Sequence, residues 1–237
     1  MIKNIAIIPA RLGSKRIPYK NILPFCGKHL IGWTIETAIE AELFDKIVVA
    51  TESTIVAEIS KKFGAEIFYI DAELTKDNVF ANEVVVDVLR SLKSNGKNYN
   101  NVYLLQPTSP LRSSADLEKA YEGFIGSGAH FLVSAVEIDP HYFHWALQKK
   151  NEPTELKDGE TIKDYEMVFP DFLKDRSLLP KKYRPDGSIK IAKVEKFLET
   201  KHFFSDNLQI YEVPEERAVH IGTQFEWDLA EFLVKKE

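Results

Sequence analysis

Short apolar runs rich in β-branched residues alternate with segments of helical periodicity through the first half of the chain. Residues 5–8, 46–51 and 65–70 form such runs, which suit strands buried on both faces of a sheet. Between them, residues 30–43 and 55–63 repeat apolar side chains at three- and four-residue spacing, as amphipathic helices do. This alternation predicts βαβ units with right-handed crossovers. We therefore expect an α/β fold of three layers (αβα), with a mostly parallel sheet between the helices.

The alternation continues to residue 138 and then stops. Helices are predicted over residues 84–92 and 117–124, and strands over residues 102–106 and 131–138. From 139 to 185, prolines, lysines and aromatic residues mix without a clear period, and no helix or strand is specified. A long stretch of this kind inside a compact domain is usually functional or an interface.

The C-terminal part returns to a regular pattern. Strands are predicted over residues 188–192, 208–213 and 218–221, and helices over residues 194–198 and 223–234. We expect the whole chain, residues 1–237, to form a single domain that contains the excursion at 139–185.

A cationic loop follows the first predicted strand. Pro9 has no amide hydrogen to donate, so it is expected to end that strand. The loop then contains four cations and two small residues: Arg11, Gly13, Ser14, Lys15, Arg16 and Lys20. Glycine lets a ligand approach the backbone closely, and cations neutralise phosphate charge. Ligands of open α/β sheets bind at the carboxyl ends of strands, so the loop is predicted to hold a polyphosphate.

The loop matches neither of the common phosphate-binding motifs. It does not end in Gly-Lys-Ser/Thr, as a Walker A motif does, and it lacks the three spaced glycines of a Rossmann fingerprint. A solvated basic loop remains an alternative on composition alone. The residue types favour phosphate without identifying the ligand.

The composition is that of an ordinary globular protein and excludes several classes. With a net charge of -5, the chain has no excess of basic residues for broad nucleic-acid binding. No run approaches the roughly 20 apolar residues of a membrane helix, and no signal-peptide pattern opens the sequence. The single cysteine, Cys26, excludes an internal disulfide and is expected to be a small apolar residue. We expect a cytoplasmic protein.

Three motifs resemble the acylneuraminate cytidylyltransferases, or CMP-sialic acid synthetases, including the enzymes for pseudaminic and legionaminic acid. They are RLGSKRIPYKNI followed by PFCGKHLIGWTI near the start, LLQPTSPLR at 104–112, and LPKKYRPDGSIKI at 179–191. The resemblance covers nearly the whole chain. It implies a Rossmann-like nucleotidyltransferase that transfers CMP from CTP to a nonulosonic (nine-carbon keto) acid and releases pyrophosphate. It also implies a homodimer, with residues 139–185 reaching across to the second subunit and the sugar site.

The resemblance assigns roles to individual residues. Arg11 and Lys20 are expected to be catalytic. The nucleotide is expected to contact a set of loop residues, namely Arg11, Gly13, Ser14, Lys15, Lys20 and Asn21. Gln106, Arg184 and Gly187 are expected to bind the sugar acid, with the planar fork of Arg184 suited to its carboxylate. Asp186 and Lys190 stand where the family has Asn and Tyr, which leaves another acidic acceptor open.

The expected metal site lacks its ligands. The resemblance implies Mg²⁺ as cofactor, because nucleotidyl transfer needs the polyphosphate charge neutralised. The family carries two aspartates, separated by one residue, before the final helix. In this chain those positions are His220 and Gly222. Glu226 lies three residues after Thr223, a spacing that favours a capping box over a metal ligand. Either the triphosphate and water hold the metal, or the protein is a weakly active nucleotide- or sugar-binding homologue.

Overall fold

The computed structural model describes residues 2–149, 154–155, 161–162, 165–169, 175 and 178–236. The chain divides into two compact units. The sheet unit consists of Met1–Ala135 and Pro185–Glu237, and the excursion unit consists of Val136–Arg184.

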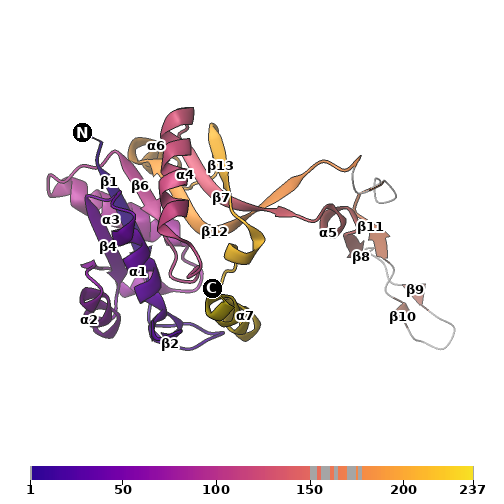
Figure 1. Cartoon of the computed structure of the whole chain (residues 1–237), viewed down its shortest axis with the longest axis horizontal. Helices are drawn as coiled ribbons and strands as arrows, with labels where there is room; N and C mark the ends of the chain where they lie inside the picture. The colour runs from indigo at the N-terminus through magenta and orange to yellow at the C-terminus, as the bar shows by residue number, and fades with distance from the viewer. Residues whose placement is uncertain are drawn as a thin grey trace. The chain divides into compact units, whose positions relative to one another are not determined.

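A seven-stranded sheet forms the centre of the sheet unit, in the order β13-β7-β12-β6-β1-β4-β5 (Figure 1). Its strands are β1 (Asn4–Pro9), β4 (Lys46–Thr51), β5 (Glu66–Tyr69), β6 (Asn101–Leu104), β7 (Phe131–Ile138), β12 (Lys182–Lys193) and β13 (Leu208–Glu212). β1 pairs in parallel with both β4 and β6, and β4 with β5 and β7 with β13 are also parallel. β12 runs antiparallel to β6. The predicted mostly parallel sheet is confirmed.

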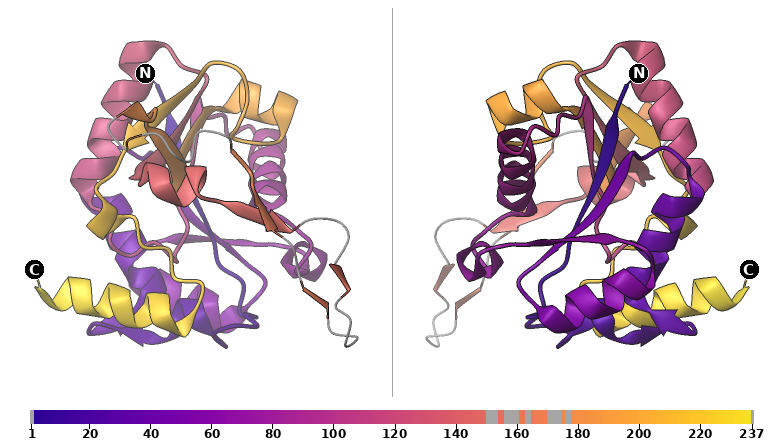
Figure 2. Two further views of the ribbon diagram at one scale, coloured as in Figure 1. Left: turned by 90° about the vertical axis from the view of Figure 1, so that its right-hand side faces the viewer. Right: turned by 90° about the vertical axis from the view of Figure 1, so that its left-hand side faces the viewer.

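Helices cover both faces of this sheet. One face carries α1 (Leu30–Glu40), α2 (Thr54–Lys62) and α4 (Ser114–Ser127), and the other carries α3 (Ala81–Ser94) and α6 (Val194–Thr200), as Figure 2 shows. Successive side chains of a strand point to opposite faces. Accordingly, Ala6 and Ile8 of β1 pack in the first core, whereas Ile5 and Ile7 pack in the second. The three-layer αβα fold is therefore confirmed.

A smaller apolar cluster holds the last helix, α7 (Gln224–Lys236), against a short hairpin of β2 (Pro24–Phe25) and β3 (Lys28–His29). The rings of Phe25 and Trp227 meet edge to face, with centroids 5.2 Å apart. Ile17 and Ile221 are buried in the same cluster. This packing brings the chain segment before α7 next to the cationic loop.

β1 ends at Pro9, as predicted: Pro9 is its last residue and pairs with Ala50 of β4, beyond the last β6 pair at Leu104. One local prediction was wrong. No strand forms over residues 218–221, which follow the 3-10 turn η5 (Glu215–Arg217). The Ile221 backbone instead makes its bonds to the loop after β6 and to the cationic loop.

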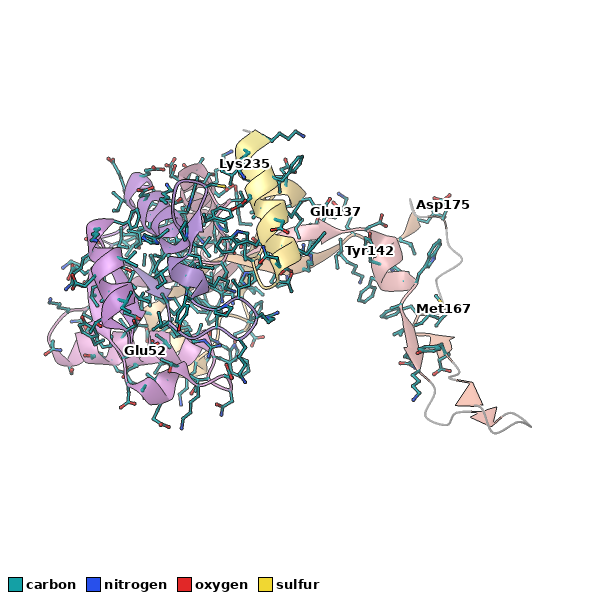
Figure 3. All side chains as sticks on the ribbon, turned by 90° about the horizontal axis from the view of Figure 1, so that it is seen from below. Glu52, Glu137, Tyr142, Met167, Asp175 and Lys235 are labelled. Carbon is teal, nitrogen blue, oxygen red and sulfur yellow. The ribbon has the colours of Figure 1, made fainter. Side chains whose placement is uncertain are left out.

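The excursion unit has more regular structure than the sequence indicated. It contains α5 (Pro140–His144), β8 (Leu147–Lys149), β9 (Thr154–Glu155), β10 (Thr161–Ile162) and β11 (Tyr165–Met167). β8 pairs with β11 and β9 with β10, both antiparallel. Tyr142 of α5 and Met167 of β11 are labelled in Figure 3. The sequence did not specify these elements strongly, because short antiparallel pairs need no long periodic pattern.

Candidate active site

A cavity of about 560 Å³ opens at the carboxyl ends of β1, β4 and β6, where an α/β sheet is expected to bind its ligand. Seven of the nine residues predicted to bind nucleotide or sugar line it: Arg11, Gly13, Ser14, Lys15, Lys20, Asn21 and Gln106. The cavity therefore brings the cationic loop together with Gln106, a residue far away in sequence.

Two loop cations share one carboxylate. Arg11 Nη1 lies 3.0 Å from Asp77 Oδ1, and Lys15 Nζ lies 2.5 Å from Asp77 Oδ2. Arg11 Nη1 also donates to Thr75 O at 2.7 Å. The hydrogen bond from Lys15, helped by the one from Arg11, lowers the pKa of Asp77. Both cations therefore have a counter-ion within the protein.

Lys20 is held differently from the other cations. Its Nζ donates to Ile221 O at 2.6 Å, a contact between residues 201 positions apart. Burial, followed by repulsion from Arg16 and Arg11, lowers the pKa of Lys20 to about 8. Asn21 Nδ2 donates to Arg11 O at 3.0 Å, so Asn21 fixes the loop backbone. Lys20 is thus the loop cation whose charge is most easily lost.

His220 lines the same cavity, beside Pro107 and Thr108. Ser109 Oγ lies 3.3 Å from its Nδ1, and Thr108 Oγ1 lies 3.2 Å from its Nε2. Burial, followed by the nearby charge of Lys20, lowers the pKa of His220. Sequence reasoning noted this residue only as the place of a missing carboxylate. The signal in the sequence was a histidine at a position where the family motif has an aspartate.

Gly187 sits between His220 and Gln106. A Cβ atom there would lie 3.4 Å from His220 Nδ1 and 3.5 Å from Gln106 Oε1. Its φ of +85° is also one that other residues rarely adopt. Gly187 therefore borders the predicted sugar end of the cavity without lining it.

The other predicted sugar ligand, Arg184, belongs to the excursion unit and is exposed on β12. Its predicted contact with a substrate carboxylate stays a prediction. Two residues further along, Asp186 is 5% exposed and neither carboxylate oxygen has a hydrogen-bond partner. Burial lowers the pKa values of nearby Arg112 and Lys190, and the negative charge of Asp186 opposes both shifts. Buried Arg112 and Asp186 and half-buried Lys190 thus form a charged group.

Part of the cavity lining, called the apolar end here, comes from the segments around Ala50 and residues 70–84. This part consists of small and aliphatic side chains and one aromatic ring: Ala50, Ile70, Leu74, Val79, Phe80, Ala81 and Val84. Phe80 is 76% exposed at the N-terminus of α3. We assigned Phe80 no role from the sequence, although an exposed aromatic ring in a polar segment was a usable signal.

The cavity does not offer a protein-held Mg²⁺ site. Mg²⁺ binds carboxylates in octahedral geometry, but Asp77 is already paired with two cations. Glu226 Oε2 accepts hydrogen bonds from Gly222 N, Thr223 N and Thr223 Oγ1, at 2.7, 2.7 and 3.0 Å. The predicted capping box is confirmed, since Thr223 Oγ1 accepts in return from Glu226 N at 3.4 Å. Within the described part of the chain, no three His, Cys, Asp or Glu side chains cluster as a metal site would require.

Comparison with known proteins decides the family. A sequence model of the family described as cytidylyltransferase matches residues 5–210. The chain belongs to the cytidylyltransferase family. The resemblance predicted from the three motifs is confirmed, and with it an enzyme fold of the nucleotidyltransferase type.

Relatives of this cytidylyltransferase cover its full length. It is 31% identical to the pseudaminic acid cytidylyltransferase of Campylobacter jejuni, over 99% of this chain and 97% of that one. It is 30% identical to the CMP-N,N'-diacetyllegionaminic acid synthase of Legionella pneumophila, over 98% and 96%. The N-acylneuraminate cytidylyltransferase of Escherichia coli O18:K1:H7 is 30% identical, and the match spans 99% of this chain but 53% of that protein.

Solved structures show the same fold. A CMP:2-keto-3-deoxy-manno-octonic acid synthetase complexed with CTP superposes with a TM-score of 0.72 at 17% identity, covering 99% of both chains. A 4-diphosphocytidyl-2C-methyl-D-erythritol synthase from Anaerococcus prevotii gives a TM-score of 0.63 at 15% identity, over 99% of this chain and 96% of that one. No helix in the described part of the cytidylyltransferase is both long and apolar enough to span a membrane.

Proposed function

We propose that this cytidylyltransferase transfers CMP from CTP to a nonulosonic acid of the sialic type and releases pyrophosphate. The observation that carries the proposal is the single cavity lined by the cationic loop, by Gln106 and by an apolar end. The names of its full-length relatives, which specify pseudaminic and legionaminic acid, support this acceptor class.

Three parts of the cavity lining suggest how CTP and the acceptor are held: the loop cations, the apolar end and the end near Gln106. The triphosphate lies against Arg11, Lys15 and Lys20, which neutralise its charge. The cytosine enters the apolar end, where the exposed ring of Phe80 offers a stacking surface. The sugar acid then occupies the end near Gln106, and Arg184 is proposed to reach its carboxylate.

Catalysis follows from positioning and charge. The acceptor hydroxyl attacks the α-phosphorus in line, and pyrophosphate leaves from the opposite side toward the loop cations. Arg11 and Lys20 stabilise the charge that accumulates on the phosphate oxygens. Because the side chains do not fit a protein-held metal, we propose that any Mg²⁺ is held by the triphosphate and water. We also propose that the enzyme works in the cytoplasm as a homodimer.

A second acceptor class has its own support. Buried Asp186, next to Gly187, and half-buried Lys190 form a charged group close to the proposed sugar end. Such a group selects for shape and hydrogen-bonding pattern, because an acceptor that leaves it unpaired binds poorly. An acidic sugar other than a nonulosonic acid is therefore the second candidate.

Pyrophosphate release from CTP tests these candidates. The acceptors are pseudaminic, N-acylneuraminic and N,N'-diacetyllegionaminic acid and the eight-carbon 2-keto-3-deoxy-manno-octonic acid, each with and without Mg²⁺. We expect release with at least one nine-carbon acid. Release with the eight-carbon acid alone would support the second candidate. CTP binding with no release from any acceptor would contradict both and leave a binding protein.

A further inference from the structure

We propose that His220 is the general base that removes the proton from the attacking hydroxyl of the acceptor. This inference rests on the proposed CMP transfer and assigns its proton-transfer step to a residue. His220 stands where the resembling enzymes carry a carboxylate, so the chain has a different chemical group at that place. The geometry of the cavity suits it to the new role.

The backbone that carries the imidazole is held between the cations proposed to bind phosphate and the residues proposed to bind the sugar. Ile221 N donates to Thr108 O at 2.7 Å, and Ile221 O accepts from Lys20 Nζ. The backbone next to His220 is therefore tied to both the loop after β6 and the cationic loop. The ring also lies close to Gly187, where a Cβ atom would be 3.4 Å from His220 Nδ1 and 3.5 Å from Oε1 of Gln106, the proposed sugar ligand. A hydroxyl attacking the α-phosphorus must lie between those cations and the proposed sugar-binding residues.

The hydroxyls around the ring leave one nitrogen able to accept a proton. Ser109 Oγ is 3.3 Å from Nδ1 and can accept the proton that this nitrogen carries. Nε2 then keeps its lone pair, with Thr108 Oγ1 3.2 Å away. Thr108 Oγ1 also lies 3.3 Å from Nδ1 and can accept the Nδ1 proton, with its own hydrogen turned away from the ring, which leaves Nε2 free for the substrate.

The charges around His220 keep it neutral at neutral pH. Burial and the cations Lys20 and Lys190 disfavour the imidazolium, whereas the carboxylates of Glu226 and Asp186 favour it. The net effect lowers the pKa of His220 below its ordinary value. A general base must be unprotonated before it acts, so this environment suits the role.

The neighbouring titratable groups are less suited. Lys20 donates to Ile221 O and must stay charged to bind phosphate. Asp77 is engaged by Arg11 and Lys15. Glu226 caps α7 through three hydrogen bonds to a single oxygen. Among the described residues that line the cavity, His220 combines a neutral state with a lone pair at the sugar end.

The proposed step balances without a further reactant. The acceptor oxygen forms a bond to the α-phosphorus as its O–H bond breaks, and the proton passes to Nε2. The bond from the α-phosphorus to the bridging oxygen breaks, and pyrophosphate leaves with that electron pair. The imidazolium then returns its proton to water. Products are the CMP-sugar acid, pyrophosphate and one proton.

The test compares His220→Asn with the wild type across pH 5–9, with pyrophosphate release at saturating acceptor. Removal of a general base costs about 10²-fold or more in kcat, and we expect that loss here with the KM for CTP changed little. The wild-type kcat/KM should fall as pH drops through the lowered pKa of His220. The CTP phosphates titrate equally in both enzymes, so dividing the wild-type kcat/KM by that of His220→Asn at each pH isolates the titration of His220. This ratio should fall at low pH.

Controls separate this inference from the proposed function and from misfolding. His202→Asn changes an exposed histidine outside the cavity and should leave activity unchanged. Thermal melting and CTP affinity should be similar in His220→Asn, and His220→Gln provides a second variant. If wild type transfers CMP while His220→Asn keeps kcat within about threefold, or if the ratio of the profiles is flat, the base is another group. If wild type transfers no CMP to any acceptor, the function fails and the role of His220 fails with it.

Discussion

The cationic loop (residues 10–21) and the pre-helix segment (His220–Thr223) line or border one cavity but differ in how they are built. The loop presents its charge openly: the Lys15 side chain is 82% exposed, and Arg11 and Lys15 pair with a surface carboxylate. The pre-helix segment places its groups through backbone bonds, from Ile221 to Thr108 and to Lys20. The first region therefore holds its cations by ion pairs near the surface, whereas the second holds its backbone by hydrogen bonds to distant parts of the chain.

The charge assigned to the loop is tested most directly by Arg11→Ala. We expect kcat/KM for CTP to fall by about 10³-fold, because a charge that stabilises the transition state is lost. The fold should persist, since Arg11 is partly exposed and lies outside the cores. Arg90→Ala, on the exposed side of α3, is the matched control and should have no effect. Activity of Arg11→Ala near the wild-type level would show that the loop is a solvated basic loop after all.

The link between the two regions is tested by the pH dependence of Lys20. Its pKa of about 8 means that the cation is present below that pH and lost above it. The kcat/KM for CTP, which reports the free enzyme, should therefore decline as pH rises through about 8. Lys20→Arg keeps its charge, so its decline should move to a higher pH or vanish. If the decline of kcat/KM with rising pH is unchanged in Lys20→Arg, the decline belongs to the titration of another group. Lys119→Arg, which changes an exposed lysine on α4, is the control.

The counter-ion in the loop predicts a smaller effect on binding. Asp77→Asn removes the carboxylate that holds Arg11 and Lys15 in the free protein. The cations are then free to meet phosphate, and CTP should bind a few-fold more tightly by calorimetry, most clearly at low salt. Weaker CTP binding would instead mean that Asp77 is needed to shape the loop.

The smallest effect concerns stability of the pre-helix segment. Glu226→Gln weakens the cap of α7, and we expect a loss of about 1 kcal/mol in the free energy of unfolding. Partial burial opposes ionisation of Glu226, but the hydrogen bonds from Gly222 and Thr223 outweigh it and lower the pKa. The carboxylate's contribution is thus present above the unfolded pKa of about 4.3 and disappears as pH falls through the folded value.

Urea denaturation measures this contribution at several pH values. The difference between wild type and Glu226→Gln should shrink below about pH 4. Glu122→Gln, exposed on α4, serves as the control. A difference that stays constant with pH would mean that the charge of Glu226 has no part in the cap.

Sequence patterns sufficed where the interactions are local. The alternation of β-branched runs and amphipathic helices predicted the layers, because apolar periodicity reflects which side a residue buries. The cations of the loop were visible as residue types close together in the chain. The Thr223–Glu226 cap was predictable too, since it needs only three-residue spacing.

The prediction that failed, and the site residue that was missed, concern residues whose contacts are distant in the chain. A strand was predicted over residues 218–221 from apolar content, yet the Ile221 backbone bonds to Lys20 and Thr108. His220 was noted only as a departure from a motif, because nothing near it in sequence indicates that it faces Gly187 and Gln106.

The order of amino acids by itself determined the α/β fold, the cationic character of the first loop and the family, because these follow from periodicity and contiguous motifs. Tertiary structure decided that the pKa values of Lys20 and His220 are both lowered. Those properties depend on burial and on charges brought together from opposite ends of the chain. Protonation depends on the surroundings that folding creates, and a linear sequence does not contain them.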